Sequence, residues 1–574
     1  MASKCFFWVA AVAMASMLDT IGQASSDRPQ VLLRGSKRLL GVCLALLATT
    51  MVVEDVANAD DATYYVDAAS GNDSNSGTST TRAWRTIDRA NTLDLQSGDR
   101  LLFRGSQTFV GNLLLGAEDA GTATRPVQVG SYGTGRARIN AGTGTGVRIY
   151  NAGGIDVSRL VVSGVGLAAG NLASGVEIYT DRGGATKFGH VRVANVEVSR
   201  FGNAGILLGT DPADGTKSGF RDVRITNVSA HDSADAGIKS FGHFSSTANG
   251  WAHENVYVGS CRTYNNGSGV VLGDANGATI ERCVAYNNGA NNNYSGGGSI
   301  GIWAWDSNRV TIQHNESYNN KTKTVDGGGF DLDGGVTNSI MQYNYSHNNA
   351  GAGYLLAQFA GARAFGNNVV RYNISENDAR KGLYGAIHFW NGNGSNGIRD
   401  TEIYNNTVYM SPQAGAAPEA VRFDSATTNV HLRNNIFVST GGVPLVHLVA
   451  GQSGLHFQGN DYWSSRGLFI IKHGGTTYTS LNSWRSACGQ ERNGVVNTGL
   501  NANPELMNPG GGGTIGNANR LSSLGAYKLG TNSPMIDAAL DLRSIFSLNP
   551  GPIDFYGTST PRGTSYDIGA HEAP

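Results

Sequence analysis

Gly301-Ile-Trp-Ala-Trp and Val310-Thr-Ile-Gln-His-Asn, two segments between residues 301 and 315, decide the fold because both recur along the chain. Segments of the first kind begin with a small residue, at Gly146, Gly175, Gly205, Gly237, Gly269, Gly329, Gly353, Ala386 and Ala420. Segments of the second kind carry one residue at a shared slot, namely Asn195, Asn227, Cys261, Cys283, Asn315, Asn344, Asn373, Asn406 and Asn435. The repeats return every 22 to 34 residues, a period that is typical of solenoids.

Within each repeat, apolar and polar residues alternate with period two, and Gly and Asn separate the segments, which predicts short β-strands. No hairpin signature joins the strands, so they should stack in parallel about 4.8 Å apart. The shared slot predicts an inward ladder of asparagine side chains that hydrogen-bond along the stack. Cys261 and Cys283 replace two adjacent rungs, either as a disulfide or as a pair of buried thiols. The sequence predicts an all-β solenoid that forms one domain.

The 574 residues divide into a leader and this solenoid. Lys37 and Arg38, the apolar run 39–53 and the small residues at 57–59 are typical of a signal peptide, so residues 1–59 are expected to be a leader, with the true translation start left open. We expect the first coils and an N-terminal cap in 60–140, central coils with the active groove in 141–460, and C-terminal coils with a closing segment in 461–574. The mature protein is then secreted, to the cell exterior or the periplasm, and no later apolar run is long enough to span a membrane.

The charge and cysteine content argue against several classes of protein. The net charge is −1 and only 15% of the residues are charged. This composition gives no indication of the excess of basic residues that binding to nucleic acid or to an anionic membrane surface needs. Three cysteines follow the leader, too few for a disulfide framework. We expect a monomer.

The two ends of the mature chain carry a family resemblance. The beginning, Tyr64-Tyr-Val-Asp-Ala-Ala-Ser-Gly-Asn-Asp with Trp84-Arg-Thr-Ile, and the ending, Asp567-Ile-Gly-Ala-His-Glu, resemble the pectin-lyase-like superfamily. The resemblance covers roughly residues 62 to 572 and implies a right-handed parallel β-helix. The resemblance indicates little about the reaction, because proteins of this superfamily include polysaccharide lyases, glycoside hydrolases, uronan epimerases and phage adhesins.

Alternation along the first kind of segment identifies the residues on the outer face of one sheet. Counting the small residue as zero, positions one and three are apolar and point inward, so positions two and four point outward. The central outward residues are Trp303 and Trp305, then Asp331 and Asp333, then, two coils later, His388 and Trp390, with Arg422 beyond. Asp306 follows Trp305 and is expected on the Asp333 side. Asp326 borders the turn that leads into the strand of Asp331 and Asp333.

This surface suggests a carbohydrate-active enzyme, because indole rings stack on sugars and clustered carboxylates transfer protons. We expect a glycoside hydrolase with catalytic Asp331, Asp333 and Asp306, which needs no cofactor. Two aspartates at i and i+2 lie about 6.5–7 Å apart at Cα, which permits a retaining or an inverting mechanism. The substrate, an extracellular polysaccharide, would bind to Trp303, Trp305, His388, Trp390 and Arg422.

Two alternatives remain open from the sequence. A pectate-lyase-like enzyme would hold Ca²⁺ on Asp306, Asp326, Asp331 and Asp333 and would need a Lys or Arg base. No basic residue lies in the same column within one coil, although Lys321, Lys323, Arg363, Arg380 and Lys381 lie in loops able to reach over. A non-catalytic carbohydrate-binding solenoid or adhesin needs the tryptophans but not the paired aspartates.

Overall fold

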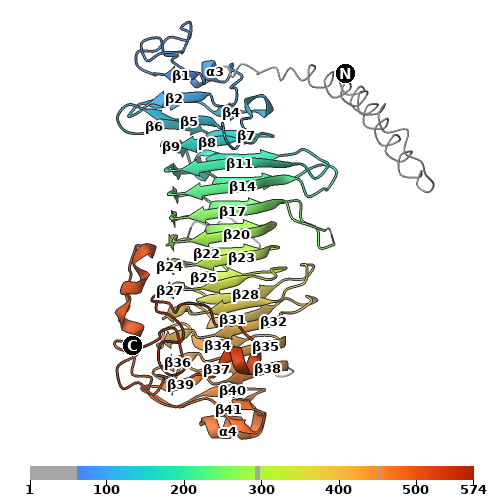
Figure 1. Cartoon of the computed structure of the whole chain (residues 1–574), viewed down its shortest axis with the longest axis vertical. Helices are drawn as coiled ribbons and strands as arrows, with labels where there is room; N and C mark the ends of the chain where they lie inside the picture. The colour runs from blue at the N-terminus through green and yellow to red at the C-terminus, as the bar shows by residue number, and fades with distance from the viewer. Residues whose placement is uncertain (1–60, 248, 291–297, 450–451) are drawn as a thin grey trace, which may run out of the picture. The chain divides into compact units, whose positions relative to one another are not determined.

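The structure is a computed structural model, and it describes residues 61–574 except 248, 291–297 and 450–451. The leader expected at residues 1–59 lies outside these residues. Within them the chain is an all-β stack of coils on three long parallel sheets, as the sequence predicts (Figure 1). The described helices include none that is long and apolar enough to cross a membrane.

Each coil gives one strand to each of three sheets, named A, B and C here. Sheet A contains, in spatial order, β1 (Thr63–Val66), β2 (Arg100–Arg104), β5 (Val127–Tyr132), β8 (Ile155–Ser158), β11 (Lys187–Ala194), β14 (Gly219–Thr226), β17 (His253–Gly259), β20 (Ala275–Glu281), β23 (Asn308–Gln313), β26 (Ile340–Gln342), β29 (Asn368–Arg371), β32 (Arg399–Tyr404), β35 (Thr428–Arg433) and β38 (Ser453–Gln458). Sheet B contains β3 (Thr108–Val110), β6 (Ala137–Gly142), β9 (Leu160–Gly164), β12 (Glu197–Ser199), β15 (Ser229–His231), β18 (Arg262–Tyr264), β21 (Val284–Tyr286), β24 (Glu316–Tyr318), β27 (Tyr345–His347), β30 (Ile374–Glu376), β33 (Thr407–Met410), β36 (Ile436–Ser439) and β39 (Asp461–Ser464).

Sheet C carries the candidate site and runs from the first coils to the last. It contains β4 (Leu113–Leu115), β7 (Val147–Tyr150), β10 (Val176–Thr180), β13 (Ala204–Thr210), β16 (Ala236–Phe241), β19 (Ser268–Gly273), β22 (Ser299–Trp305), β25 (Asp326–Leu332), β28 (Tyr354–Gln358), β31 (Gly385–Asn391), β34 (Glu419–Phe423), β37 (Val446–Leu448), β40 (Ile471–His473) and the antiparallel edge strand β41 (Thr476–Tyr478). The remaining described elements are the helices α3 (Ile87–Ala90), α4 (Leu481–Cys488) and α5 (Leu542–Phe546), the 3₁₀ turns η1 (Ala117–Asp119), η2 (Leu167–Ala169), η3 (Ala518–Ser523) and η4 (Gly525–Tyr527), and the hairpin β42 (Arg492–Asn493) and β43 (Val496–Asn497).

The predicted inward and outward faces of sheet C are confirmed. In the register of β22 and β25, Ile302 pairs with Phe330 and Ala304 with Leu332, and these apolar side chains are fully buried. Trp303 pairs with Asp331 on the opposite face. Because a one-residue slip would expose the whole apolar set, the buried core keeps this register in place.

The predicted asparagine ladder lines the turn between sheets A and B. The side-chain oxygen of Asn344 accepts the backbone N–H of Asn315 at 3.0 Å, and Asn373 accepts that of Asn344 at 3.0 Å. Each rung thereby pairs a buried turn N–H that would otherwise lack a partner. Cys261 and Cys283 are buried free thiols in this ladder, which decides between the two alternatives for that pair.

The ladder prediction was wrong at its first two rungs. Asn195 and Asn227 are exposed and left-handed, with φ of 57° and 52°. Val196 and Val228, one residue later, are the buried side chains at those two turns. A second ladder, which the sequence analysis missed, lines the turn between sheets B and C and contains Asn266, Asn288, Asn320, Asn349 and Asp378.

The end of the chain does not continue the coils. After β41 and α4, the chain returns and packs on the outer face of sheet B, where Leu521, Tyr527 and Phe555 share an apolar cluster with Tyr345 and Ile374. The sequence predicts C-terminal coils and a closing segment in 461–574; β39, β40 and the edge strand β41 are the last strands of the three long sheets, and residues after α4 cover sheet B. Apolar residues on the outer face of sheet B explain this path, because burying them stabilises the folded state.

Candidate active site

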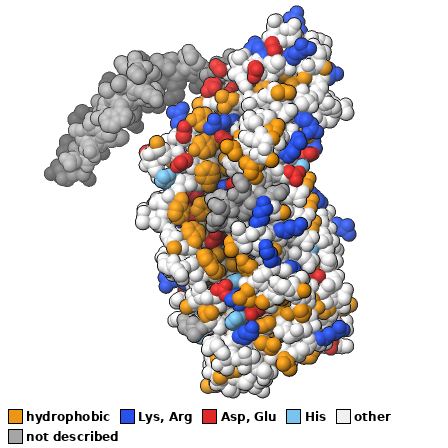
Figure 2. Space-filling view, turned by 180° about the vertical axis from the view of Figure 1, so that it is seen from behind, with side chains coloured by type: hydrophobic (Ala, Val, Ile, Leu, Met, Phe, Trp, Pro, Cys, Tyr) orange, Lys and Arg blue, Asp and Glu red, His pale blue; other side chains and the backbone are white. Residues whose placement is uncertain are grey.

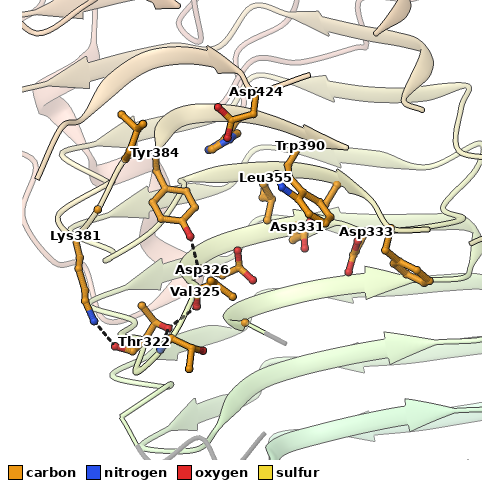
Figure 3. A pocket seen from close by; sticks show the side chains of 17 residues that line it. Thr322, Val325, Asp326, Asp331, Asp333, Leu355, Lys381, Tyr384, Trp390 and Asp424 are labelled. Atoms are coloured by element: carbon orange, nitrogen blue, oxygen red, sulfur yellow. Dashed lines mark hydrogen bonds and ion pairs between the residues drawn. The ribbon is translucent and has the colours of Figure 1, made fainter. Parts of the chain in front are cut away.

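A cavity of about 660 Å³ lies on the outer face of sheet C, over β25, β28, β31 and the residue after β34. Figure 2 shows hydrophobic side chains gathered in a band along the stack of coils, with acidic side chains lying within it. The cavity is lined by Gly298, Thr322, Thr324, Val325, Asp326, Asp331, Asp333, Leu355, Ala357, Phe359, Lys381, Gly382, Leu383, Tyr384, His388, Trp390 and Asp424. The structure thus brings the predicted Asp331, Asp333, His388 and Trp390 together in one cavity, and Figure 3 shows Asp331, Asp333 and Trp390 within it.

Strand β25 and the residue that follows it position three carboxyl groups in this cavity, those of Asp326, Asp331 and Asp333, which are called the carboxyl groups of β25 below. Asp331 lies at the outward position between Trp303 and Leu355 in the register, and Asp333 follows two residues later. Asp326 begins the strand, where its backbone N–H donates to the hydroxyl of Tyr384 at 2.8 Å. The register of β22 and β25 shifts beside Asp326, so this residue leaves the regular alternation of the strand.

A glycine makes room for the Asp326 carboxyl. A Cβ on Gly298 would lie 1.5 Å from a carboxyl oxygen of Asp326, far inside van der Waals contact. Any other residue at 298 would therefore displace this carboxyl from its place in the cavity.

Burial raises the pKa of all three carboxyl groups. It raises the pKa of Asp326 to about 7, with a contribution from the charge of Asp333. Burial raises the pKa of Asp333 to about 6, although the hydrogen bond from the backbone N–H of Gly334, 2.7 Å long, acts in the opposite direction. Burial and then the charges of Asp333 and Asp326 raise the pKa of Asp331 well above its usual range. The cluster therefore holds protons at a pH where ordinary aspartates are ionised.

A histidine–aspartate pair closes the other side of the cavity. His388, on β31, is 2% exposed, and its Nε2 lies 2.9 Å from Oδ2 of Asp424, just after β34. Arg422 is not among the lining residues; its guanidinium lies 2.5 Å from Asp424 and 2.9 Å from Glu419. Burial acts to raise the pKa of Asp424, but the hydrogen bond and charge of His388, together with Arg422, lower it below its usual value.

Asp306 lies in a different environment from the three carboxyls of β25. It is fully buried, and its Oδ1 lies 2.9 Å from Nε of Arg363, which also approaches Asp274 at 3.6 Å. Burial raises the pKa of Asp306 to about 6, against the positive charge of Arg363. Asp306 does lie on the Asp333 side, since its backbone N–H donates to the carbonyl of Gly334 at 2.7 Å, but it turns left-handed after β22, with φ of 42°, and its carboxyl pairs with Arg363 and is not among the groups that line the cavity.

The four aspartates named as Ca²⁺ ligands are therefore divided between two places. In the part of the chain that the structure describes, no three His, Cys, Asp or Glu side chains are grouped so as to hold a metal ion. Of the loop lysines and arginines, Lys381 reaches the cavity, where its Nζ donates to the carbonyl of Thr322 at 2.9 Å. Lys321 and Arg380 line another hollow.

The structure adds site residues that the sequence analysis did not single out. Tyr384 and Asp424 both line the cavity. Asp424 stands at an outward position of its segment, so the alternation alone was a signal for it. Tyr384 precedes β31 in a loop, and no pattern in the sequence indicates where its ring lies. Trp303 and Trp305, predicted as substrate-binding, line a neighbouring cavity.

Comparisons with known proteins support the fold. A family model described as a right handed beta helix region matches residues 251–408. The lacto-N-biosidase of Bifidobacterium longum subsp. longum is 25% identical over 485 residues, which cover 66% of this chain and 29% of that protein, so the chain spans less than a third of its length. A crystal structure of GH136 lacto-N-biosidase from Eubacterium ramulus is 20% identical, with a TM-score of 0.52 over 65% of this chain and 68% of that chain. A crystal structure of the native form of the same enzyme is 19% identical, with a TM-score of 0.50 over 64% of this chain and 68% of that chain. The predicted right-handed parallel β-helix is confirmed.

Proposed function

We propose that this protein is a glycoside hydrolase that uses the carboxyl groups of β25. The observation that carries the proposal is that Asp326, Asp331 and Asp333 share one cavity and all have raised pKa values. Hydrolysis of a glycosidic bond needs one carboxyl that keeps its proton and one that is ionised. Carboxyls whose surroundings separate their pKa values can divide these roles.

The surroundings favour a role for each carboxyl. Asp333, with a pKa of about 6 and the Gly334 N–H on its oxygen, is proposed as the ionised nucleophile or base. Asp326, with a pKa of about 7, is proposed as the acid that protonates the leaving oxygen. Asp331 keeps its proton and orients its neighbours or a sugar hydroxyl. This assignment replaces the predicted trio of Asp331, Asp333 and Asp306.

The charge of the cavity favours a neutral glycan. Four aspartates line it, two of which keep their protons in these roles, and Asp424 is paired with His388 and Arg422, so Lys381 is the one unpaired basic side chain among the lining residues and the cavity offers a uronic acid little net attraction. The similarity to lacto-N-biosidases supports a hydrolase as well. We propose an extracellular oligo- or polysaccharide as the substrate and no cofactor.

Lys381 supports a second candidate, a lyase that removes a proton from a uronic acid. Its side chain lines the cavity and is exposed. In that case Ca²⁺ would offset the carboxyl charges, as in metal-assisted elimination.

One experiment separates the two candidates. The full chain is incubated with neutral and uronic-acid glycans, with lacto-N-biosides included, while reducing ends and the ultraviolet absorbance of unsaturated sugars are recorded with and without EDTA. Reducing ends without absorbance, insensitive to EDTA and lost in Asp326→Asn and Asp333→Asn but not in the exposed control Asp222→Asn, are expected. Absorbance that disappears with EDTA would establish the lyase, and no product from any glycan would favour a non-catalytic sugar-binding solenoid.

A further inference from the structure

A second cavity, of about 480 Å³, lies on sheet C on the N-terminal side of the proposed catalytic cavity. It is lined by Asn203, Asp235, Lys239, Phe241, Gly242, Ser268, Val271, Gly298, Trp303 and Trp305. Gly298 lines both cavities. Trp303 pairs in register with Asp331, so the wall of the second cavity stands directly beside a carboxyl of the first.

Aromatic rings form one wall of this second cavity and hold a fixed place. Trp303, Trp305 and Phe241 are partly buried and pack on a small apolar cluster that contains Leu207 and Val271. Packing on one side leaves the other side of an aromatic ring for a ligand, with little rotamer freedom left to lose on binding.

The aromatic rim continues from one cavity to the other. The ring of Phe244 lies 5.9 Å from that of Trp305 and 6.2 Å from that of Phe359. Phe359 lines the catalytic cavity, and Phe244 is 41% exposed. These contacts form a row of apolar rings that leads from the first cavity to the second.

The two charged side chains among these lining residues, Lys239 and Asp235, form an ion pair. Nζ of Lys239 lies 2.5 Å from Oδ2 of Asp235, and both side chains keep about a quarter of their surface exposed, at 22% and 24%. An ammonium and a carboxylate side by side offer a donor and an acceptor to adjacent hydroxyls. Because their charges cancel, the pair gives no net attraction to an anionic ligand.

We propose that this cavity is a second sugar-binding subsite, which takes a neutral sugar of the same glycan whose bond is broken over β25. The inference rests on the proposed function and extends it to the substrate class, a neutral oligosaccharide that lies along the axis of the solenoid. Asp331 and Lys239 are separated by three strand spacings, because Asp331 pairs with Trp303, Trp303 with Val271 and Val271 with Lys239. The distance between the two strands is therefore about 14 Å, which is longer than one sugar ring.

The test follows the indole N–H resonances of the full chain, which has eight tryptophans, in the Asp333→Asn variant to prevent turnover. Trp303, Trp305 and Trp390 are assigned by single replacements with Phe. The probes are cellohexaose, xylohexaose, mannohexaose, chitohexaose, lacto-N-biose and, as the anionic comparison, hexagalacturonate. We expect at least one neutral hexasaccharide to shift the resonances of Trp303, Trp305 and Trp390 together, and hexagalacturonate to shift none of them.

A replacement series measures the strength of the subsite with the neutral probe that shifts most. Trp305→Ala should weaken binding about tenfold, the value of one large apolar contact, while Tyr286→Ala, an aromatic on the outer face of sheet B, should leave it unchanged. A shift at Trp390 without any at Trp303 and Trp305 would overturn the subsite but leave the hydrolase proposal standing. If hexagalacturonate alone shifted the resonances of Trp303 and Trp305, the proposal that the subsite takes a neutral sugar would be overturned. If no probe shifted any of the three tryptophan resonances, both the subsite and the hydrolase proposals would be overturned.

Discussion

At the scale of single residues, the aspartates of β25 differ in how their positions arise. Asp331 and Asp333 face outward because their neighbours Phe330 and Leu332 are buried, so alternation along the strand predicts them. Asp326 stands at the strand's leading edge, where the register shifts and Gly298 leaves room for its carboxyl. Its pKa of about 7 is a property of this burial and of the charge of Asp333.

The pH dependence of the reaction tests the proposed roles. The rate should rise as Asp333 loses its proton near its pKa of about 6 and fall as Asp326 loses its proton near its pKa of about 7, so kcat/KM should be greatest between these values. Asp326→Asn should lower kcat by about 10²- to 10⁴-fold and remove the alkaline limb from the residual activity. The measurement is the pH profile on an aryl glycoside and on a natural glycan, with Asp222→Asn as the control. An unchanged alkaline limb in Asp326→Asn would assign the acid to another group.

At the scale of elements, the ladders between the sheets hold the turns that set the coil register. Asn344 donates to the carbonyl of Ile312 at 2.9 Å and to the side-chain oxygen of Asn373 at 3.1 Å, and it accepts from the N–H of Asn315. All of these groups are buried, so each depends on its neighbour in the stack for a hydrogen-bond partner.

Replacing one rung should therefore destabilise the coil. Asn344→Ala leaves a buried N–H and a buried carbonyl unpaired, and we expect a loss of about 1–3 kcal/mol in the free energy of unfolding for each such group. Asn227→Gly is the matched control, because Asn227 is exposed and its φ of 52° suits glycine. Denaturant unfolding of both variants measures the difference. Equal effects would show that the ladder hydrogen bonds contribute little net stability.

At the scale of residues 61–574 as a whole, the returning C-terminal segment covers sheet B, whereas the site lies on sheet C. Glu376, at the end of β30, is 3% exposed and accepts the backbone N–H of Gly512 at 2.9 Å and the hydroxyl of Tyr527 at 2.7 Å. Glu316 likewise accepts the N–H groups of Ile515 and Gly516, both at 2.7 Å. Buried carboxyl groups thus hold the segment at defined points.

This attachment can be tested by proteolysis. Glu376→Ala removes the shared acceptor, so the segment should become cleavable by protease and the melting temperature should fall, by an amount that corresponds to about 1–3 kcal/mol for each donor left unpaired. The partly exposed Glu254 provides the control Glu254→Ala. Glycan binding at the sheet C cavities should be unchanged, since the segment lies on another sheet. A fully protected segment in Glu376→Ala would mean that apolar packing alone holds it.

The parallel coil, the faces of sheet C and the outward positions of Asp331, Asp333, His388 and Trp390 can be predicted from the sequence, because they follow from local alternation and from a repeat that each coil shares with its neighbours. The prediction from the sequence misplaced the first ladder rungs by one residue, because an outward left-handed asparagine and an inward one look alike in sequence. The tertiary structure alone decided that Asp306 pairs with Arg363, that Asp326 and Tyr384 join the cavity, and that the tryptophans line a cavity of their own. Those outcomes depend on loop paths and on burial among residues far apart in the chain, and no local periodicity encodes them.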